Sequence, residues 1–215
     1  MNVVISVARD LFQCWLQTIK RTCCLILFTP TCRFWTEKPD LWHFPDPYRA
    51  IYWPGGQALI RSVYLRYCVV LINDAVLSGL FSQKGAGSRL WLTCGASAIA
   101  AKLTGASRVV ANDIDPSETY NMIGSKPDAW DLILLRDMFY DEDLADRLHK
   151  CLQTCITTHG AQVLIGDPGR AQFESHDIRR LLYKLAHFEL PDSVKEENYR
   201  LTNSTVWCYN YKPDL

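Results

Sequence analysis

With 215 residues, 48% of them hydrophobic, the chain is long enough to bury one sizeable core. Its 23 basic residues match its 23 acidic residues, a balance that indicates neither nucleic acid nor an anionic membrane as the main partner. No apolar run approaches the roughly 18 residues of a membrane-spanning helix. We therefore expect no nucleic-acid or membrane partner, so the function has to be inferred from a site. We also expect a monomer.

The first 35 residues differ in composition from the rest of the chain. Their apolar residues recur at helical spacing, and they carry a single acid, Asp10, against four basic residues, Arg9, Lys20, Arg21 and Arg33. A basic, acid-poor and amphipathic start is typical of an organelle transit segment. The alternative is an ordinary first helix that packs its apolar face on the rest of the protein. We therefore divide the chain into a transit segment, residues 1–35, and one folded domain, residues 36–215.

The nine cysteines form no Cys-x-x-Cys pair, and no second Cys or His pair completes a zinc site with Cys151 and Cys155. We therefore expect no structural metal. Scattered thiols of this kind behave as small buried hydrophobic residues, and they are typical of a reducing compartment.

An aromatic and proline-rich segment ends at Pro54-Gly55-Gly56, which opens a predicted helix over Gln57–Val70. Trp53 stands beside Gly55, and an indole next to bare backbone can form one wall of a purine pocket. The alternative is that Trp53 only covers a sheet edge.

A short strand at Arg89–Leu92, a turn at Gly95, a helix over 97–103 and a strand at Val109–Ala111 predict a right-handed βαβ unit. Asp113 and Asp115 follow the second strand directly. A carboxylate at the carboxyl end of such a strand can accept both hydroxyl protons of a ribose. The alternative is that the two residues only start a turn and cap the next helix.

The second half of the chain alternates apolar strand-like runs with amphipathic helical ones. We predict strands at Asp131–Asp137, Gln162–Arg170 and Thr205–Tyr211 and helices at Leu144–Thr154 and Asp177–Phe188. The last strand alternates as a half-exposed antiparallel strand would.

Several of these segments resemble the seven-strand protein-lysine methyltransferases, and the resemblance runs from about Thr29 to Trp207. The motifs that carry it are Tyr48–Gln57, Ala98–Lys102, Ala111–Pro116, Asp137–Ala145 and Ile165–Arg170. The resemblance implies an α/β fold with the Rossmann-like class I methyltransferase sheet, ending in an antiparallel strand. It also implies S-adenosylmethionine as cofactor and the lysines of a protein as substrate.

Within this family, the branch that methylates the electron transfer flavoprotein beta subunit is the most similar. That similarity implies this subunit as partner and the mitochondrial matrix as location, with the cytoplasm as the alternative.

Carried over by position, the resemblance assigns two sets of site residues. Asp137, Phe139 and Tyr140 match the acid and aromatic residues that border the target lysine, where Asp137 orients the amine or cofactor and the two rings wall its channel. The predicted cofactor residues are Trp53, Gly55, Cys94, Gly95, Asp113 and Asp115.

Two departures from the family pattern matter. The loop Leu90–Gly95 lacks the acid and the earlier glycines that let the backbone approach the cofactor. The segment 117–129 is too short for a helix, a strand and a helix, since one parallel crossover needs about a dozen residues. We therefore expect the third strand of the 3-2-1-4-5-7-6 order, an edge strand, to be missing.

These departures leave two rival functions. A catalytically impaired relative or splice form would only bind the partner protein. A nicotinamide-dependent oxidoreductase would share the acid after the second strand, but the glycine fingerprint that such an enzyme needs is absent.

Overall fold

The computed structural model describes residues 53–62, 89–92, 108–111, 129–190 and 201–209, together with Lys38 and Ile123. All of these except Lys38 belong to one compact unit formed by Trp53–Leu190 and Leu201–Leu215. The predicted transit segment and the predicted helix 97–103 lie outside the described residues.

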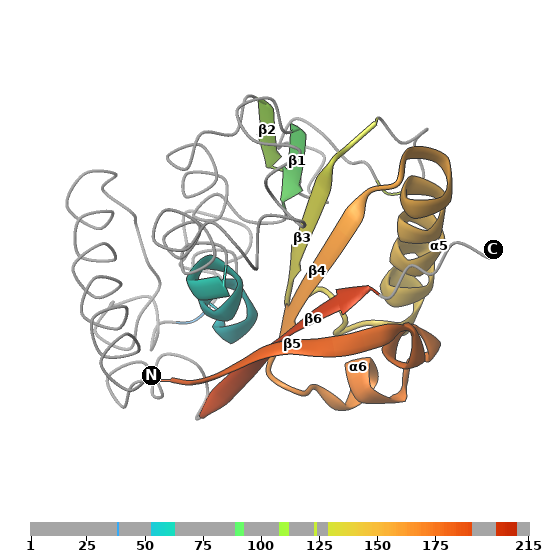
Figure 1. Cartoon of the computed structure of the whole chain (residues 1–215). Helices are drawn as coiled ribbons and strands as arrows, with labels where there is room; N and C mark the ends of the chain where they lie inside the picture. Colours follow the sequence, from blue (N-terminus) through green and yellow to red (C-terminus); the bar gives the residue numbers. More distant parts are fainter. Residues whose placement is uncertain are drawn as a thin grey trace, which may run out of the picture. The chain divides into compact units, whose positions relative to one another are not determined.

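The described part of the chain contains one mixed sheet with the strand order β2-β1-β3-β4-β6-β5 (Figure 1). Its strands are β1 (Arg89–Leu92), β2 (Arg108–Ala111), β3 (Leu132–Arg136), β4 (Gln162–Asp167), β5 (Leu182–Glu189) and β6 (Asn203–Tyr209). The strands β1 to β4 run parallel to one another, while β6 runs antiparallel to both β4 and β5. The described strands follow the order expected from the resemblance, so the predicted Rossmann-like methyltransferase fold is confirmed, while the expected loss of the third strand stays a prediction. The segment 117–129, apart from Ile123 and Ala129, lies outside the described residues.

The helix α5 (Glu142–His159) crosses from β3 to β4 and covers one face of the sheet. It begins at Asp141, whose side chain accepts a hydrogen bond from the Leu144 backbone N–H at 2.9 Å. It ends at Gly160, whose φ of 63° is the left-handed conformation that glycine adopts freely. Both ends extend beyond the predicted helix: the first turn adds Glu142 and Asp143, and the last adds residues 155–159, in which Cys155 and Ile156 continue the buried face.

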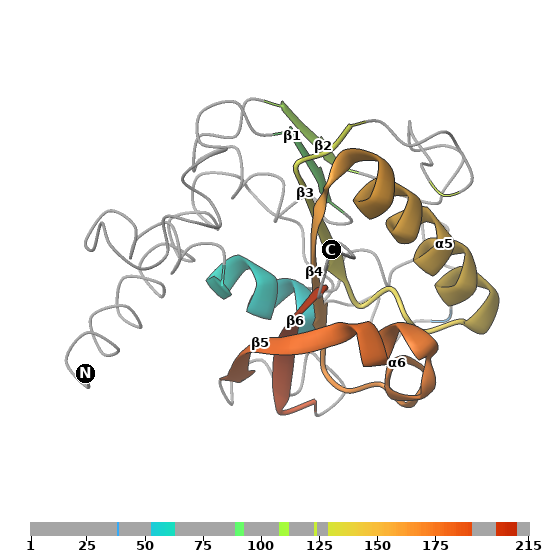
Figure 2. The same ribbon diagram turned by 45° about the vertical axis from the view of Figure 1, so that its right-hand side comes forward.

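The sheet is covered on both faces, which explains its nearly continuous apolar strands. Ile133 and Leu135 of β3 face the core beneath α5, whereas Leu132 and Leu134 face the other side. There they pack with Ala58 and Leu59 of the helix formed by residues 54–62. Figure 2 views the sheet nearly edge-on, with α5 and this helix on opposite faces.

The predicted helix over Asp177–Phe188 is wrong. Only a short 3₁₀ helix, η5 (Asp177–Leu181), forms there, and β5 follows as an outer strand paired with β6. The register shifts between Lys184 and Ala186, which places Leu185, Ala186 and Phe188 against the same core. Because of this irregularity, the apolar residues of β5 do not alternate with a period of two. Leu182, Leu185 and Phe188 are instead three residues apart, a spacing that also occurs on one face of a helix.

The terminal strand is antiparallel as predicted, but the expected half exposure is wrong. Residues 204–208 of β6 are all buried, because the strand lies between β4 and β5. Val206 and Cys208 face one core, and Trp207 faces the other. The cysteines of the described part, Cys151, Cys155 and Cys208, are buried free thiols.

Candidate active site

Two carboxylates meet where neighbouring parallel strands end. Asp137 directly follows β3, and Asp167 is the last residue of β4. The strands are aligned so that Arg136 pairs with Gly166, and the Asp137 backbone N–H donates to the Gly166 carbonyl at 2.9 Å. Asp137 has a φ of 53°, a left-handed conformation that aspartate tolerates better than most side chains do. The positive φ turns the chain out of the sheet at this point.

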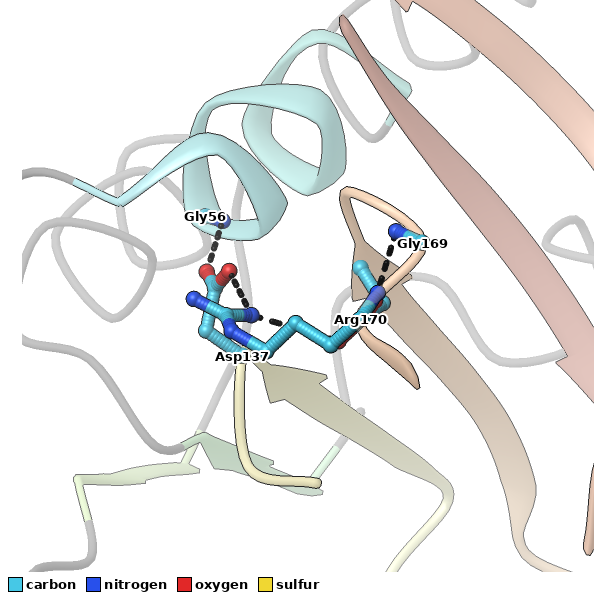
Figure 3. Close-up of polar contacts among 5 residues, drawn as sticks. Gly56, Asp137, Gly169 and Arg170 are labelled. Atoms are coloured by element: carbon cyan, nitrogen blue, oxygen red, sulfur yellow. Dashed lines mark hydrogen bonds and ion pairs between the residues drawn. The ribbon is translucent and has the colours of Figure 1, made fainter. Parts of the chain in front are cut away.

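Arg170 joins the two carboxylates, and Figure 3 shows its guanidinium group beside Asp137. Its Nη1 donates to Asp137 Oδ1 at 2.6 Å and to Asp167 Oδ2 at 3.2 Å. The Asp167 Oδ1 atom accepts the backbone N–H groups of Gly169 at 2.7 Å and of Arg170 at 2.8 Å. Pro168 followed by Gly169, with a φ of 88°, is the sequence of a tight turn. Asp167 therefore shapes the turn that returns Arg170 to the strand ends.

The helix of residues 54–62 points its first turn at Asp137. The Gln57 N–H donates to the Trp53 carbonyl at 3.2 Å, so Pro54 occupies the first helical position. The Gly56 N–H, one of the donors that a helix leaves unpaired at its start, donates to Asp137 Oδ2 at 3.2 Å. A carboxylate 81 residues away in the sequence thus acts as the cap of this helix.

Two glycines allow this approach. A Cβ atom at Gly55 would lie 2.6 Å from Asp137 Oδ2 and closer still to the Gly166 carbonyl oxygen. A Cβ atom at Gly166 would meet the Gly55 carbonyl in the same way. The backbones of the helix and of β4 are therefore in direct contact, and neither position has room for a side chain.

Trp53 lies beside the same cluster. The Arg170 guanidinium carbon lies 5.5 Å from the centroid of the Trp53 ring, within the range of a cation–π contact. The structure therefore brings together three of the predicted site residues, Trp53, Gly55 and Asp137, around an arginine for which the sequence predicts no role.

Burial dominates the electrostatics of the cluster. The side chains of Asp137 and Asp167 are only 5% and 1% exposed. Burial raises the pKa of Asp137, while the charge of Arg170 opposes that rise. Burial also raises the pKa of Asp167, to about 6. At Arg170 burial lowers the pKa, but the two carboxylates outweigh it and raise the pKa overall. When both acids are ionised, the cluster has one more negative charge than positive.

The aromatic residues after Asp137 lie in different environments. Phe139 is fully buried and packs edge-on against Phe173, with ring centroids 5.3 Å apart, and against His176 at 5.6 Å. Tyr140 is 55% exposed. In this structure Tyr140 can offer a surface to a substrate, whereas Phe139 anchors the segment in the core. A direct role of Phe139 beside the lysine stays a prediction.

The remaining predicted cofactor residues, Cys94, Gly95, Asp113 and Asp115, lie outside the described residues. Within the part of the chain that the structure does describe, no group of three His, Cys, Asp or Glu residues is placed to hold a metal ion. No helix of that part is long and apolar enough to cross a membrane.

The sequence gives no role to Arg170 or Gly166, although both belong to a motif that it singles out. The available signal is the run Gly-Asp-Pro-Gly-Arg after a buried strand. That run predicts a tight turn at the strand end, but it does not predict which residue the arginine binds.

The sheet order and the carboxylates at the ends of its central strands define a Rossmann-like class I methyltransferase fold. No protein-family model matches the chain. Three relatives named electron transfer flavoprotein beta subunit lysine methyltransferase or its homolog are similar over most of it. The Danio rerio protein is 62% identical over 88% of this chain and 76% of its own length. The Homo sapiens protein is 48% identical over 86% of this chain and 73% of its own length. The Caenorhabditis elegans homolog is 31% identical over 85% of this chain and 86% of its own length.

The chain therefore belongs to the electron transfer flavoprotein beta subunit lysine methyltransferase family. A solved structure of the N-methyltransferase NodS from Bradyrhizobium japonicum, in complex with S-adenosyl-l-homocysteine, is also similar. The matched region covers 78% of this chain and 92% of the NodS chain, with a TM-score of 0.44 and 14% sequence identity.

Proposed function

We propose that the chain transfers methyl groups from S-adenosylmethionine to lysine side chains of the electron transfer flavoprotein beta subunit. The observation that carries this proposal is the 62% identity, over 88% of the chain, with a relative that bears this activity in its name. The site supports it independently, because the matched motif Asp137–Tyr140 lies at the carboxyl end of a central strand, where ligands bind in open α/β sheets.

The residues present fit a cationic cofactor. When Asp137 and Asp167 are both ionised, their two negative charges exceed the single positive charge of Arg170, which bonds both, and this favours a positively charged group at the strand ends. We assign Trp53 and Gly55 to the cofactor side of the site, together with Cys94, Gly95, Asp113 and Asp115 on the strength of the family motif. When bound, S-adenosylmethionine supplies an electrophilic methyl group on a sulfonium.

The chain's own residues then act mainly by positioning, which can supply a large part of the rate enhancement in a displacement between two bound reactants. Asp137 has one carboxylate oxygen on Arg170 and the other on Gly56. We therefore assign it fixed negative charge that orients the amine or the cofactor. Tyr140, with its exposed ring, borders the lysine.

The test is methyl transfer from isotopically labelled S-adenosylmethionine to purified beta subunit, with the modified residues located by tandem mass spectrometry. We expect label on lysine side chains, and an Asp137→Asn variant that transfers at least tenfold more slowly. A folded chain that binds the subunit and transfers no label would contradict the proposal and favour the binding-only alternative.

We further propose the mitochondrial matrix as location, on the basis of the basic, amphipathic composition of residues 1–35. A fluorescent protein fused behind these residues should enter mitochondria. Diffuse fluorescence in the cytoplasm would contradict this proposal.

A further inference from the structure

We propose that Arg170 is a positioning residue for methyl transfer: it fixes Asp137 in its charged form between the strand ends and the first turn of the helix of residues 54–62. The inference rests on the proposed function only for its effect on catalysis. The positioning itself follows from the contacts described above.

In the described part of the chain, the side chain of Asp137 is held by two contacts, one with Arg170 and one with Gly56. Its side chain is 5% exposed, so water cannot replace the interactions that hold it. Oδ1 has Arg170 Nη1 at 2.6 Å, a charge-assisted hydrogen bond, and Oδ2 has the Gly56 N–H at 3.2 Å. Arg170 therefore supplies the direct ionic partner, while Gly56 supplies a neutral donor.

Other charged groups act on Asp137 as well. Arg136 on β3 also lowers its pKa, but less than Arg170 does. Asp167 at the end of β4 is a second negative charge in the same cluster, since the two acids share Arg170 Nη1. From the helix of residues 54–62 the facing group is the Gly56 N–H. Without Arg170, two buried carboxylates would repel each other, and the pKa of Asp137 would rise further.

The same guanidinium faces Trp53, at 5.5 Å from the ring centroid. Arg170 thus contacts one residue assigned to the lysine side of the site and one assigned to the cofactor side. At 21% side-chain exposure it lies mostly inside the protein. A rigid, planar guanidinium suits this bridging position better than a lysine ammonium would.

The first experiment needs no catalytic activity. The free energy of unfolding is measured by urea titration from pH 4 to 9 for wild type, Arg170→Met and the double variant Arg170→Met/Asp137→Asn. A buried carboxyl with a raised pKa makes the free energy of unfolding fall as the pH rises through that pKa. Because the pKa of Asp137 should be higher without Arg170, this fall should continue to a pH about one to three units higher in Arg170→Met than in wild type. In the double variant residue 137 no longer titrates, so the free energy of unfolding should lose the part of this additional fall at higher pH that Asp137 causes. An Arg170→Met variant with the same pH dependence as wild type would overturn the proposal.

The second experiment is the pH profile of kcat/KM for methyl transfer. We expect the acidic limb of Arg170→Met to move up by about one unit or more, with a loss of activity on that limb that recovers toward pH 9. Arg170→Lys, which keeps the charge, should move less. Arg180→Met is the matched control, because Arg180 is 85% exposed and pairs only with Asp177 among the described residues; its profile should match wild type.

A uniform loss of activity at every pH would mean that Arg170 only supports the scaffold, and would overturn the proposal. If Arg170→Met does not fold, Arg170→Gln, which also removes the charge, replaces it, and an acidic limb that does not move overturns the proposal in the same way. If wild type transfers no methyl group at all, the proposed function fails, while the unfolding experiment still decides the role of Arg170.

Discussion

Replacing Gly55 with alanine tests the contact that holds the helix of residues 54–62 against the sheet. In a helix without such a contact, glycine to alanine stabilises a protein by about 0.5–1 kcal/mol. Here the new Cβ atom would lie 2.6 Å from Asp137 Oδ2 and closer to the Gly166 carbonyl, so the helix has to move away from β4. The expected sign of the effect is therefore reversed.

The magnitude follows from two losses. Forcing a methyl group into a filled contact costs about 1–3 kcal/mol. Losing the hydrogen bond between the Gly56 N–H and the Asp137 carboxylate costs about 1.5–3 kcal/mol. After the gain in helix propensity, Gly55→Ala should reduce the free energy of unfolding by about 2–5 kcal/mol, with a fall in Tm on the order of 10 °C.

The assay is urea unfolding followed by circular dichroism, with Gly160→Ala as control. No atom lies within 4 Å of a Cβ at Gly160, whose φ is 63°, so that variant should lose only about 1–2 kcal/mol to backbone strain. A Gly55→Ala protein as stable as wild type, or more stable, would refute the direct contact between the helix and β4.

Three further predictions concern single residues. Gly166→Ala meets the same obstacle from the strand side and should lower stability in urea as much as Gly55→Ala does; a neutral effect would count against the contact. Tyr140→Ala should lower the rate of methyl transfer more than the affinity for S-adenosylmethionine in calorimetry, and equal losses of both would exclude a role beside the lysine. The pKa of Asp167, raised by burial to about 6, lies above its unfolded value near 3.9, so stability should fall as pH rises from about 4 through 6. Asp167→Asn should remove this decline in unfolding experiments, and an unchanged decline would assign it to another group.

The fold could be predicted mainly where the chain is buried on both faces. The strands β3 and β4 are mostly apolar runs, with Asp137 directly after β3 and Asp167 as the last residue of β4, and this pattern belongs to a central parallel strand. The outer strand β5 could not be predicted in this way. Its apolar residues at 182, 185 and 188 have helical spacing, and only pairing with β6 across a register shift makes them a strand.

The candidate site could be predicted in part. A carboxylate placed at a strand end identifies Asp137, and a tryptophan beside paired glycines identifies Trp53. The contacts between them depend on which residues the sheet brings together, since Arg170 and Asp137 are 33 residues apart and Gly56 and Asp137 are 81 apart. The sequence indicates where the strands end, but the register of β3 with β4 determines that Arg170 forms its ion pair with Asp137.

Isothermal titration calorimetry of S-adenosylmethionine into the purified chain tests most directly whether the carboxyl ends of its central strands hold the cofactor. We expect binding in the micromolar range, about −8 kcal/mol, that is lost in Asp113→Ala and retained in the exposed control Arg180→Met. A well-folded chain that releases no heat of binding, or an Asp113→Ala variant that binds as tightly as wild type, would contradict this assignment of the site.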